Sequence, residues 1–348
     1  MRIAIIRPME NRLKTRVLFC LLPFLVTSAS LAQNSAGGFS LAKSIPMPGV
    51  QGKFDHSAVD VKGKRLFVAA TGNKSVEVLD LNSGQWINRI AGIGKAQGIY
   101  YVPDFNLLIA TDGIGAAAKF YKGDTLAPLQ TVSLSADADY VTYDPVGKRF
   151  FVAHGGDDAG HDYGEIAIID AATLKIVSSI RTAGHPEAMK LDNQSHLFVN
   201  VPDANHIAVA DPATAKVTST WPLTNAKKNV PMALNEKDGR LYIATRDPGL
   251  FFAYDSSSGK IVASIPTVGG ADDMAYDPRR RQIYVSGGDG YVAVIHVDDA
   301  DHYREIGRLA TGPNAKTSLF APEFNSIYVA VPAQTNQPAV LKIFQASN

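Results

Sequence analysis

The feature that most constrains the fold is a short apolar stretch that recurs seven times along the chain. Each copy is followed by a tight turn and a second strand-forming segment, as in RLFVAATG (65–72) and RFFVAHGG (149–156). The last residues of successive stretches are 41, 43, 48, 43, 42 and 44 positions apart. The stretches are HSAVD (56–60), QGIYY (97–101), YVTYD (140–144), AMKLD (188–192), PMALN (231–235), DMAYD (273–277) and TSLFA (317–321). This regular period indicates a fold built from one repeated unit.

Each unit reads as four short antiparallel strands. The turns between the first two segments are rich in Gly, Pro, Asn and Asp, which favour the backbone angles of tight hairpins. A third segment with alternating apolar residues follows, such as EIAIIDA (165–171), and then a fourth, such as IVASI (261–265). A period of about 40–45 residues with four strands is typical of a β-propeller, whereas a sandwich does not repeat in this way and a β-helix has a much shorter period. We therefore expect an all-β, seven-bladed propeller of four-stranded antiparallel blades.

The two ends of the repeat array predict how the ring closes. After AVLKIFQ (339–345) the chain stops one strand short of a complete seventh unit. Near the other end, FSLAKSIPM (39–47) reads like a fourth strand that precedes the first unit. We expect this N-terminal strand to complete the last blade, which removes an open sheet edge.

The N-terminal residues resemble an export signal. Basic residues precede the apolar run VLFCLLPFLVTSASLA (17–32), which ends in small side chains. This pattern predicts a secretory signal peptide, residues 1–32, that is cleaved after Ala32 and leaves residues 33–348 as a single propeller domain in the periplasm or outside the cell. The apolar core is too short to span a bilayer, so we expect no transmembrane segment in the mature chain. The single cysteine, Cys20, would leave with the signal peptide.

The repeats also resemble a known family. The segments LFVAATGNKSVEVLD (66–80) and IYVSGGDGYVAVI (283–295) are similar to those of YVTN-repeat propellers, which include YncE-like proteins. The resemblance covers nearly all of the predicted mature chain and implies a seven-bladed, WD40-like ring in the periplasm or outside the cell. It implies no settled activity, because one fold supports many functions.

Charge and missing motifs exclude several function classes. The formal net charge is +1, without the strong basic excess of nucleic-acid-binding proteins, so we do not expect a nucleic-acid partner. The sequence contains no GxSxG elbow, no HExxH, no phosphate-binding GxxxxGK[ST] and no dinucleotide-binding GxGxxG between strand and helix. Chemistry driven by a nucleotide is therefore not expected.

Polar residues precede the predicted inner strands, and these residues should converge at one end of the central channel, on what we call the top face. The candidate ligand-binding residues at this channel mouth are Asp55, His56, Gln97, Asp139, His185, Glu187, Arg246, Asp272, Asp273 and Lys316. Carboxylates and imidazoles that converge can hold a divalent metal ion, for which the candidates are His56, His185, Glu187 and Asp272. The alternative is that these groups only solvate strand ends and hold blades together.

Two functions from different classes remain open. The first is a binding protein that recognises a small-molecule ligand or a protein partner through its top face, as loops on a rigid scaffold allow. The second is a metal-assisted hydrolase or lyase, similar to lactonases, with its site at the channel mouth. No catalytic residue is assigned, because no constellation in the sequence is specific for catalysis. Apart from a divalent metal ion, no cofactor is indicated.

Overall fold

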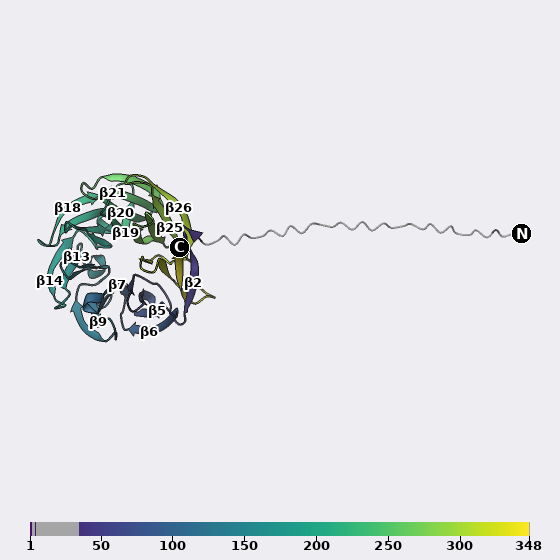
Figure 1. Cartoon of the computed structure of the whole chain (residues 1–348), viewed down its shortest axis with the longest axis horizontal. Coiled ribbons are helices and arrows are strands. Elements are labelled where there is room, and N and C mark those ends of the chain that lie inside the picture. Colours follow the sequence, from purple (N-terminus) through teal and green to yellow (C-terminus); the bar gives the residue numbers. More distant parts are fainter. Residues whose placement is uncertain (2–3, 5–34, 348) are drawn as a thin grey trace. The chain divides into compact units, whose positions relative to one another are not determined.

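The chain forms seven antiparallel β-sheets that stand side by side around a ring, as the computed structural model shows (Figure 1). The structure describes residues 1, 4 and 35–347. Nearly all of the predicted signal peptide, including the cleavage point after Ala32, lies outside the described residues. Among the residues that are described, no helix is both long and apolar enough to cross a bilayer. The prediction of an all-β, seven-bladed propeller is confirmed.

Each sheet is one blade, and in six blades the strands follow one another in chain order, from the inner strands such as β7 and β19 to the outer strands such as β6 and β18 (Figure 1). These blades are β3 (Ser57–Asp60), β4 (Arg65–Ala70), β5 (Ser75–Asp80) and β6 (Gln85–Ala91); β7 (Ala96–Val102), β8 (Leu107–Asp112), β9 (Ala117–Lys122) and β10 (Pro128–Ser133); β11 (Val141–Asp144), β12 (Arg149–Gly155), β13 (Gly164–Asp170) and β14 (Ile176–Thr182); β15 (Met189–Leu191), β16 (Leu197–Val201), β17 (His206–Asp211) and β18 (Lys216–Pro222); β19 (Lys227–Asn235), β20 (Arg240–Asp247), β21 (Leu250–Asp255) and β22 (Ile261–Pro266); β23 (Ala271–Asp277), β24 (Gln282–Gly287), β25 (Tyr291–Val297) and β26 (Tyr303–Ala310).

The seventh blade combines the two ends of the repeat array. Its strands are β27 (Leu319–Ala321), β28 (Ser326–Val331), β29 (Ala339–Ala346), β2 (Phe39–Met47) and β1 (Ser35–Ala36). Strand β2 pairs with β29 from Phe39 opposite Ala346 to Met47 opposite Ala339, so the predicted N-terminal closing strand is confirmed. The two-residue strand β1 adds a fifth strand that the sequence pattern did not predict.

The core lies between neighbouring blades. Adjacent sheets pack face to face, so the middle strands are covered on both sides and are mostly apolar. In β12, for example, Phe150 and Phe151 point to opposite faces and are both 0% exposed. Val152 of this strand packs in the same cluster as Ile109 of β8, in the preceding blade. The apolar second segment of each repeat therefore provides the contact between blades.

Buried aspartates hold the hairpins that join inner strands to second strands. Asp144 accepts hydrogen bonds from the backbone N–H of Gly147 at 2.9 Å and from the Arg149 side chain at 3.0 Å. Asp60 makes the equivalent contacts in the first blade. The side chains of Asp60 and Asp144 are 4% and 5% exposed, so these carboxylates are part of the fold. The same turns contain single-residue left-handed positions, such as Lys148 at φ 51°.

Short 3₁₀ helices occupy several of the remaining turns. They are η1 (Thr71–Asn73), η2 (Pro103–Phe105), η3 (Asp157–Ala159) and η4 (Pro202–Ala204). In the second blade, η2 follows Val102, which pairs with Leu107. The equivalent pair in the first blade is Asp60 with Arg65. The predicted apolar stretch 97–101 therefore ends one residue early, because the second inner strand is longer than its turn residues suggest.

Candidate ligand-binding channel

The residues around the central channel form three tiers, with one residue from each repeat in each tier. The lower tier has one residue from each inner strand, and each of them pairs with the aromatic residue or Ile that recurs in the second strand. These residues are Ala58, Tyr100, Thr142, Lys190, Ala233, Ala275 and Leu319. The middle tier lies two residues earlier in the chain and consists of His56, Gly98, Tyr140, Ala188, Pro231, Asp273 and Thr317. The upper tier lies one residue earlier still and consists of Asp55, Gln97, Asp139, Glu187, Val230, Asp272 and Lys316. We call the end of the channel nearest this tier the upper end.

A β-bulge at the start of the inner strands directs two successive side chains into the channel. The N–H of Asp55 donates to the carbonyl of Ala69 at 2.9 Å, and the N–H of Ala69 donates to the carbonyl of His56 at 3.0 Å. The same arrangement joins Asp139 and Tyr140 to one residue of β12. In a regular strand neighbouring side chains point to opposite faces, whereas a bulge changes the direction of one of them. The upper and middle tiers consequently both reach the channel.

Ion pairs between blades neutralise one side of the upper tier. Arg246, from β20, and Lys316, from the segment before β27, both contact the carboxylate of Asp272. Asp272 is 4% exposed, and burial alone would raise its pKa, but Lys316 and Arg246 hold that pKa below its usual range. This carboxylate is therefore ionised and bound on both sides by cations from neighbouring blades.

The other side of the upper tier is less well neutralised. Gln97 donates a hydrogen bond from Nε2 to Asp139. His185 Nε2 lies 4.0 Å from Asp139 Oδ2, while Nδ1 of the same ring lies 2.8 Å from the carbonyl oxygen of Gly155. Burial and the nearby charge of Asp55 raise the pKa of Asp139 well above its usual range. A charged Asp139 is therefore costly in this environment.

Burial also perturbs other acidic groups at the upper end. Burial raises the pKa of Asp55, although His56 acts in the opposite direction. Burial likewise raises the pKa of Glu187, although His185 and Arg246 lower it. These pKa shifts follow first from burial, and the charge of the nearby Asp272 adds to both.

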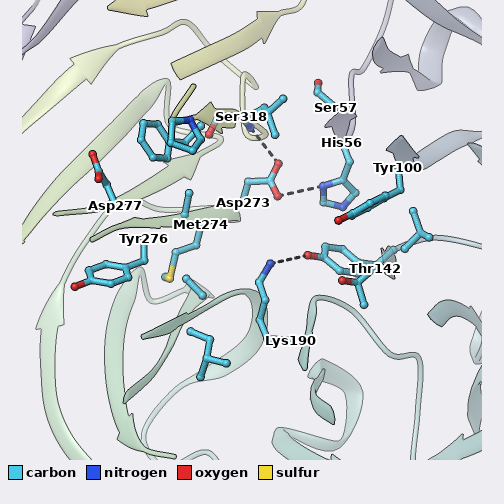
Figure 2. A pocket seen from close by; sticks show the side chains of 18 of the residues that line it. His56, Ser57, Tyr100, Thr142, Lys190, Asp273, Met274, Tyr276, Asp277 and Ser318 are labelled. Atoms are coloured by element: carbon cyan, nitrogen blue, oxygen red, sulfur yellow. Dashed lines mark hydrogen bonds and ion pairs between the residues drawn. The ribbon is translucent and has the colours of Figure 1, made fainter. Parts of the chain in front are cut away.

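A histidine–aspartate pair joins the first and sixth blades in the middle tier (Figure 2). His56 Nδ1 lies 3.1 Å from Asp273 Oδ1, and Asp273 Oδ2 accepts the backbone N–H of Ser318 at 3.1 Å. His56 Nε2 lies 3.6 Å from Asp55, and the Tyr140 ring packs edge-on against the imidazole at 5.1 Å. Burial would lower the pKa of His56, but Asp273 and Asp55 raise it well above its usual value.

Below this pair lies a cavity of about 630 Å³. Figure 2 shows Tyr100, Lys190, Asp273 and His56 directed toward this space. Lys190, from β15, donates to the hydroxyl of Tyr140 at 3.3 Å. No carboxylate among the described residues forms an ion pair with Lys190. The cavity continues past apolar and aromatic side chains to hairpins at the opposite end of the channel, with the lining residues Met274, Tyr276, Pro278, Arg279, Leu319, Phe320 and Pro322.

The structure gathers the candidate residues around the upper end of the channel, although they do not form one metal site. The contacts there involve Asp55, His56, Gln97, Asp139, His185, Glu187, Arg246, Asp272, Asp273 and Lys316. Among the described residues, the groups with metal-ligand spacing are Asp55 with His56 and Asp139, and Asp137 with Asp139 and His185. The predicted set of His56, His185, Glu187 and Asp272 is not one of these groups, and Asp272 is already paired with Arg246 and Lys316.

Sequence reasoning missed the lower tier and the cavity. Lys190 lies inside the apolar stretch AMKLD (188–192). A charged residue within an apolar stretch is the one sequence signal from which the cavity could have been predicted. Tyr100 and Tyr140 read as ordinary strand formers, so their convergence on Lys190 was not apparent. These residues come from three consecutive blades and meet at the inner edges of those blades.

Comparisons with known proteins give the fold and no more. No family model and no curated protein matches the chain, so the resemblance to YVTN-repeat propellers stays a prediction. A chain of the Kuenenia stuttgartiensis hydrazine synthase aligns with a TM-score of 0.72 and 15% sequence identity, over 86% of this chain and 99% of that chain. A chain of the mitotic checkpoint complex aligns with a TM-score of 0.74 and 12% identity, over 100% of this chain and 99% of that chain. At these identities the likeness shows a WD40-like β-propeller fold alone.

Proposed function

We propose that this protein is a binding propeller that holds a small anionic molecule in its central channel, with the acid group of the ligand against Lys190. The observation that carries this proposal is the environment of the ammonium group. A lysine ammonium has three N–H donors. Among the described residues, that of Lys190 makes one hydrogen bond, to Tyr140, and it lines the cavity.

The rest of the cavity suits a ligand with an apolar or aromatic body. Its volume of about 630 Å³ falls within the range typical of small-molecule sites. Tyr100, Tyr276 and Phe320 supply aromatic surface, and Met274 supplies an adaptable apolar contact. In the upper tier Asp272 is already paired with Arg246 and Lys316, so the cavity beneath that tier is the better place for an anionic ligand.

This proposal keeps the expected binding function and places the ligand lower than the top face. Recognition of a protein partner by the top face remains the alternative within the same class, and a propeller fold is compatible with either. A metal-assisted hydrolase or lyase is the second candidate function. It is favoured by one observation: His56, which borders the cavity, also belongs to a group with metal-ligand spacing.

The N-terminal pattern at residues 17–32 supports a location in the periplasm or outside the cell. If the chain is exported in this way, N-terminal sequencing of the exported protein will begin at Gln33. Exported material that still carries residues 1–32 would contradict cleavage after Ala32.

Calorimetric titration with small aromatic carboxylates tests the binding function. Phenylacetate and benzoate are the probes, and phenylacetamide and benzamide are their neutral counterparts. We expect the carboxylates to bind at least tenfold more tightly than the amides, and Lys190→Met to remove that preference. Lys175→Met, at an exposed lysine of the third blade, is the matched control and should bind as the wild type does. Equal binding of acids and amides, or an unchanged Lys190→Met variant, would overturn the proposal.

A further inference from the structure

The orientation of His56 leaves one ring nitrogen available to a ligand. When Nδ1 carries the proton, it donates to Asp273 Oδ1 at 3.1 Å, and the Ser318 backbone N–H fixes Asp273 from the other side at 3.1 Å. Nε2 faces Asp55, whose Oδ1 is 3.6 Å away, and it can bind a cation in place of the proton that the neighbouring carboxylates stabilise there. Histidines that bind metal ions typically donate their other ring N–H to a carboxylate in this way. Asp273 therefore acts as a positioning residue for His56.

Two buried polar atoms without partners lie beside Asp139. Gln97 is 3% exposed, its amide is directed at the Asp139 carboxylate, and its Oε1 has no hydrogen-bond partner within the described part of the chain. The buried His185 Nε2, 4.0 Å from Asp139 Oδ2, also has no hydrogen-bond partner there. Buried polar atoms are rarely left unsatisfied unless something absent from the protein chain satisfies them. Gln97 Oε1 lies against Gly113, so it is His185 Nε2 that points to a polar ligand beside Asp139.

The distribution of charge indicates that this ligand is a cation. Asp272 is neutralised by Arg246 and Lys316. Within the described residues, Asp55 and Asp139 have only the histidines His56 and His185 within ion-pair distance, and neither carboxylate pairs with a lysine or an arginine. Two buried carboxylates close to each other are stable as anions only when a positive charge lies between or beside them.

We propose that Asp55, His56 and Asp139 bind one divalent cation at the upper end of the channel. One ligand atom from each residue can be chosen so that all three lie within 4.8 Å of one another. Two ligand atoms that each lie about 2.0–2.2 Å from one ion can be no more than about 4.4 Å from each other. The three side chains therefore need to move only slightly closer together to bind the ion. An imidazole with two carboxylates favours Zn²⁺ or Mn²⁺ over Ca²⁺, which prefers an all-oxygen site. The site does not depend on the anionic ligand proposed above.

Isothermal titration of the purified, chelator-treated protein with ZnCl₂ and with MnCl₂ tests the site. We expect one high-affinity ion per chain. His56→Ala and Asp139→Asn should each weaken that binding at least tenfold. Asp273→Asn should weaken it about tenfold, as removal of a group that orients a metal ligand usually does. No small carboxylate is present in this experiment, so its failure and the failure of the proposed ligand-binding function are distinguishable.

An exposed histidine–aspartate pair provides the control for adventitious binding. His302 Nδ1 lies 2.8 Å from Asp299, on the surface of the sixth blade, and the two side chains are 76% and 61% exposed. His302→Ala should leave the affinity for the ion unchanged. Absence of binding, binding that survives His56→Ala, or binding lost in His302→Ala would each overturn the channel site.

A second measurement covers the case in which the channel variants do not fold. X-ray absorption spectroscopy of the Zn²⁺-loaded wild-type protein reports the donor atoms directly. The site predicts one imidazole among oxygen donors. A spectrum without an imidazole donor would contradict the assignment, whatever the variants do.

Discussion

The contacts between blades and the walls of the channel are built from the same repeats but follow opposite rules. Between blades, the same kinds of residue return in every unit, such as the Leu-Phe-Val of β4 and the Ile-Tyr-Val of β24. Across the channel, equivalent positions differ from blade to blade: the middle tier has histidine in one blade, tyrosine in another and aspartate in a third. Repetition therefore determines the fold, and departures from repetition at the channel positions determine what the molecule can bind.

The largest effect should come from the core of the closing blade. Phe39, on β2, is 0% exposed and packs against Tyr284 with ring centroids 5.2 Å apart. We expect Phe39→Ala to lower the free energy of unfolding by about 3–5 kcal/mol, because it empties a packed core position. Leu41→Ala on the same strand is the control, since Leu41 is 38% exposed, and it should cost less than about 1 kcal/mol. Urea denaturation measures both, and equal losses would refute the role of Phe39 in closure.

A buried histidine away from the channel should make stability depend on pH. Burial lowers the pKa of His154, on β12, to about 4, with its Nδ1 accepting the Ser135 N–H at 3.3 Å. As the pH falls, His154 of the unfolded chain therefore binds a proton near pH 6.5, whereas His154 of the folded chain binds it only near pH 4. Stability should fall by about 3 kcal/mol as the pH drops through that window.

The test of this pH effect is a comparison of variants. His154→Asn cannot take up the proton, so its unfolding free energy should vary less between pH 7 and pH 4 than that of the wild type. Parallel pH profiles for the two proteins would show that His154 does not titrate as its burial requires.

A smaller effect should come from the hairpin carboxylates, which resemble the channel carboxylates in burial but differ in role. Asp144→Ala removes the acceptor for Gly147 and Arg149 and should cost about 1–3 kcal/mol of stability. It should leave the binding of phenylacetate and of Zn²⁺ unchanged. Thermal unfolding measures the stability and calorimetry measures the binding, both on the same preparation. An Asp144→Ala variant that loses binding while keeping its stability would show that hairpin and channel carboxylates do not differ in role.

The difference between the two regions also explains what could be predicted from sequence. The blades and the closing strand β2 were predictable, because each depends on apolar spacing that is local and repeated. The upper tier was predictable as a ring, because its residues hold the same position in successive repeats. The cavity was not, because the contact of Lys190 with Tyr140 joins neighbouring blades through side chains 50 residues apart. The metal grouping was not either, since it depends on distances between side-chain atoms of the first and third blades.

The most direct test of the central claim is to measure binding and stability together for Lys190→Met. If channel residues serve binding, the affinity for phenylacetate should fall at least tenfold, while the free energy of unfolding changes by less than about 1 kcal/mol. A variant that loses several kcal/mol of stability and binds phenylacetate as tightly as the wild type would contradict the account, because Lys190 would then belong to the fold.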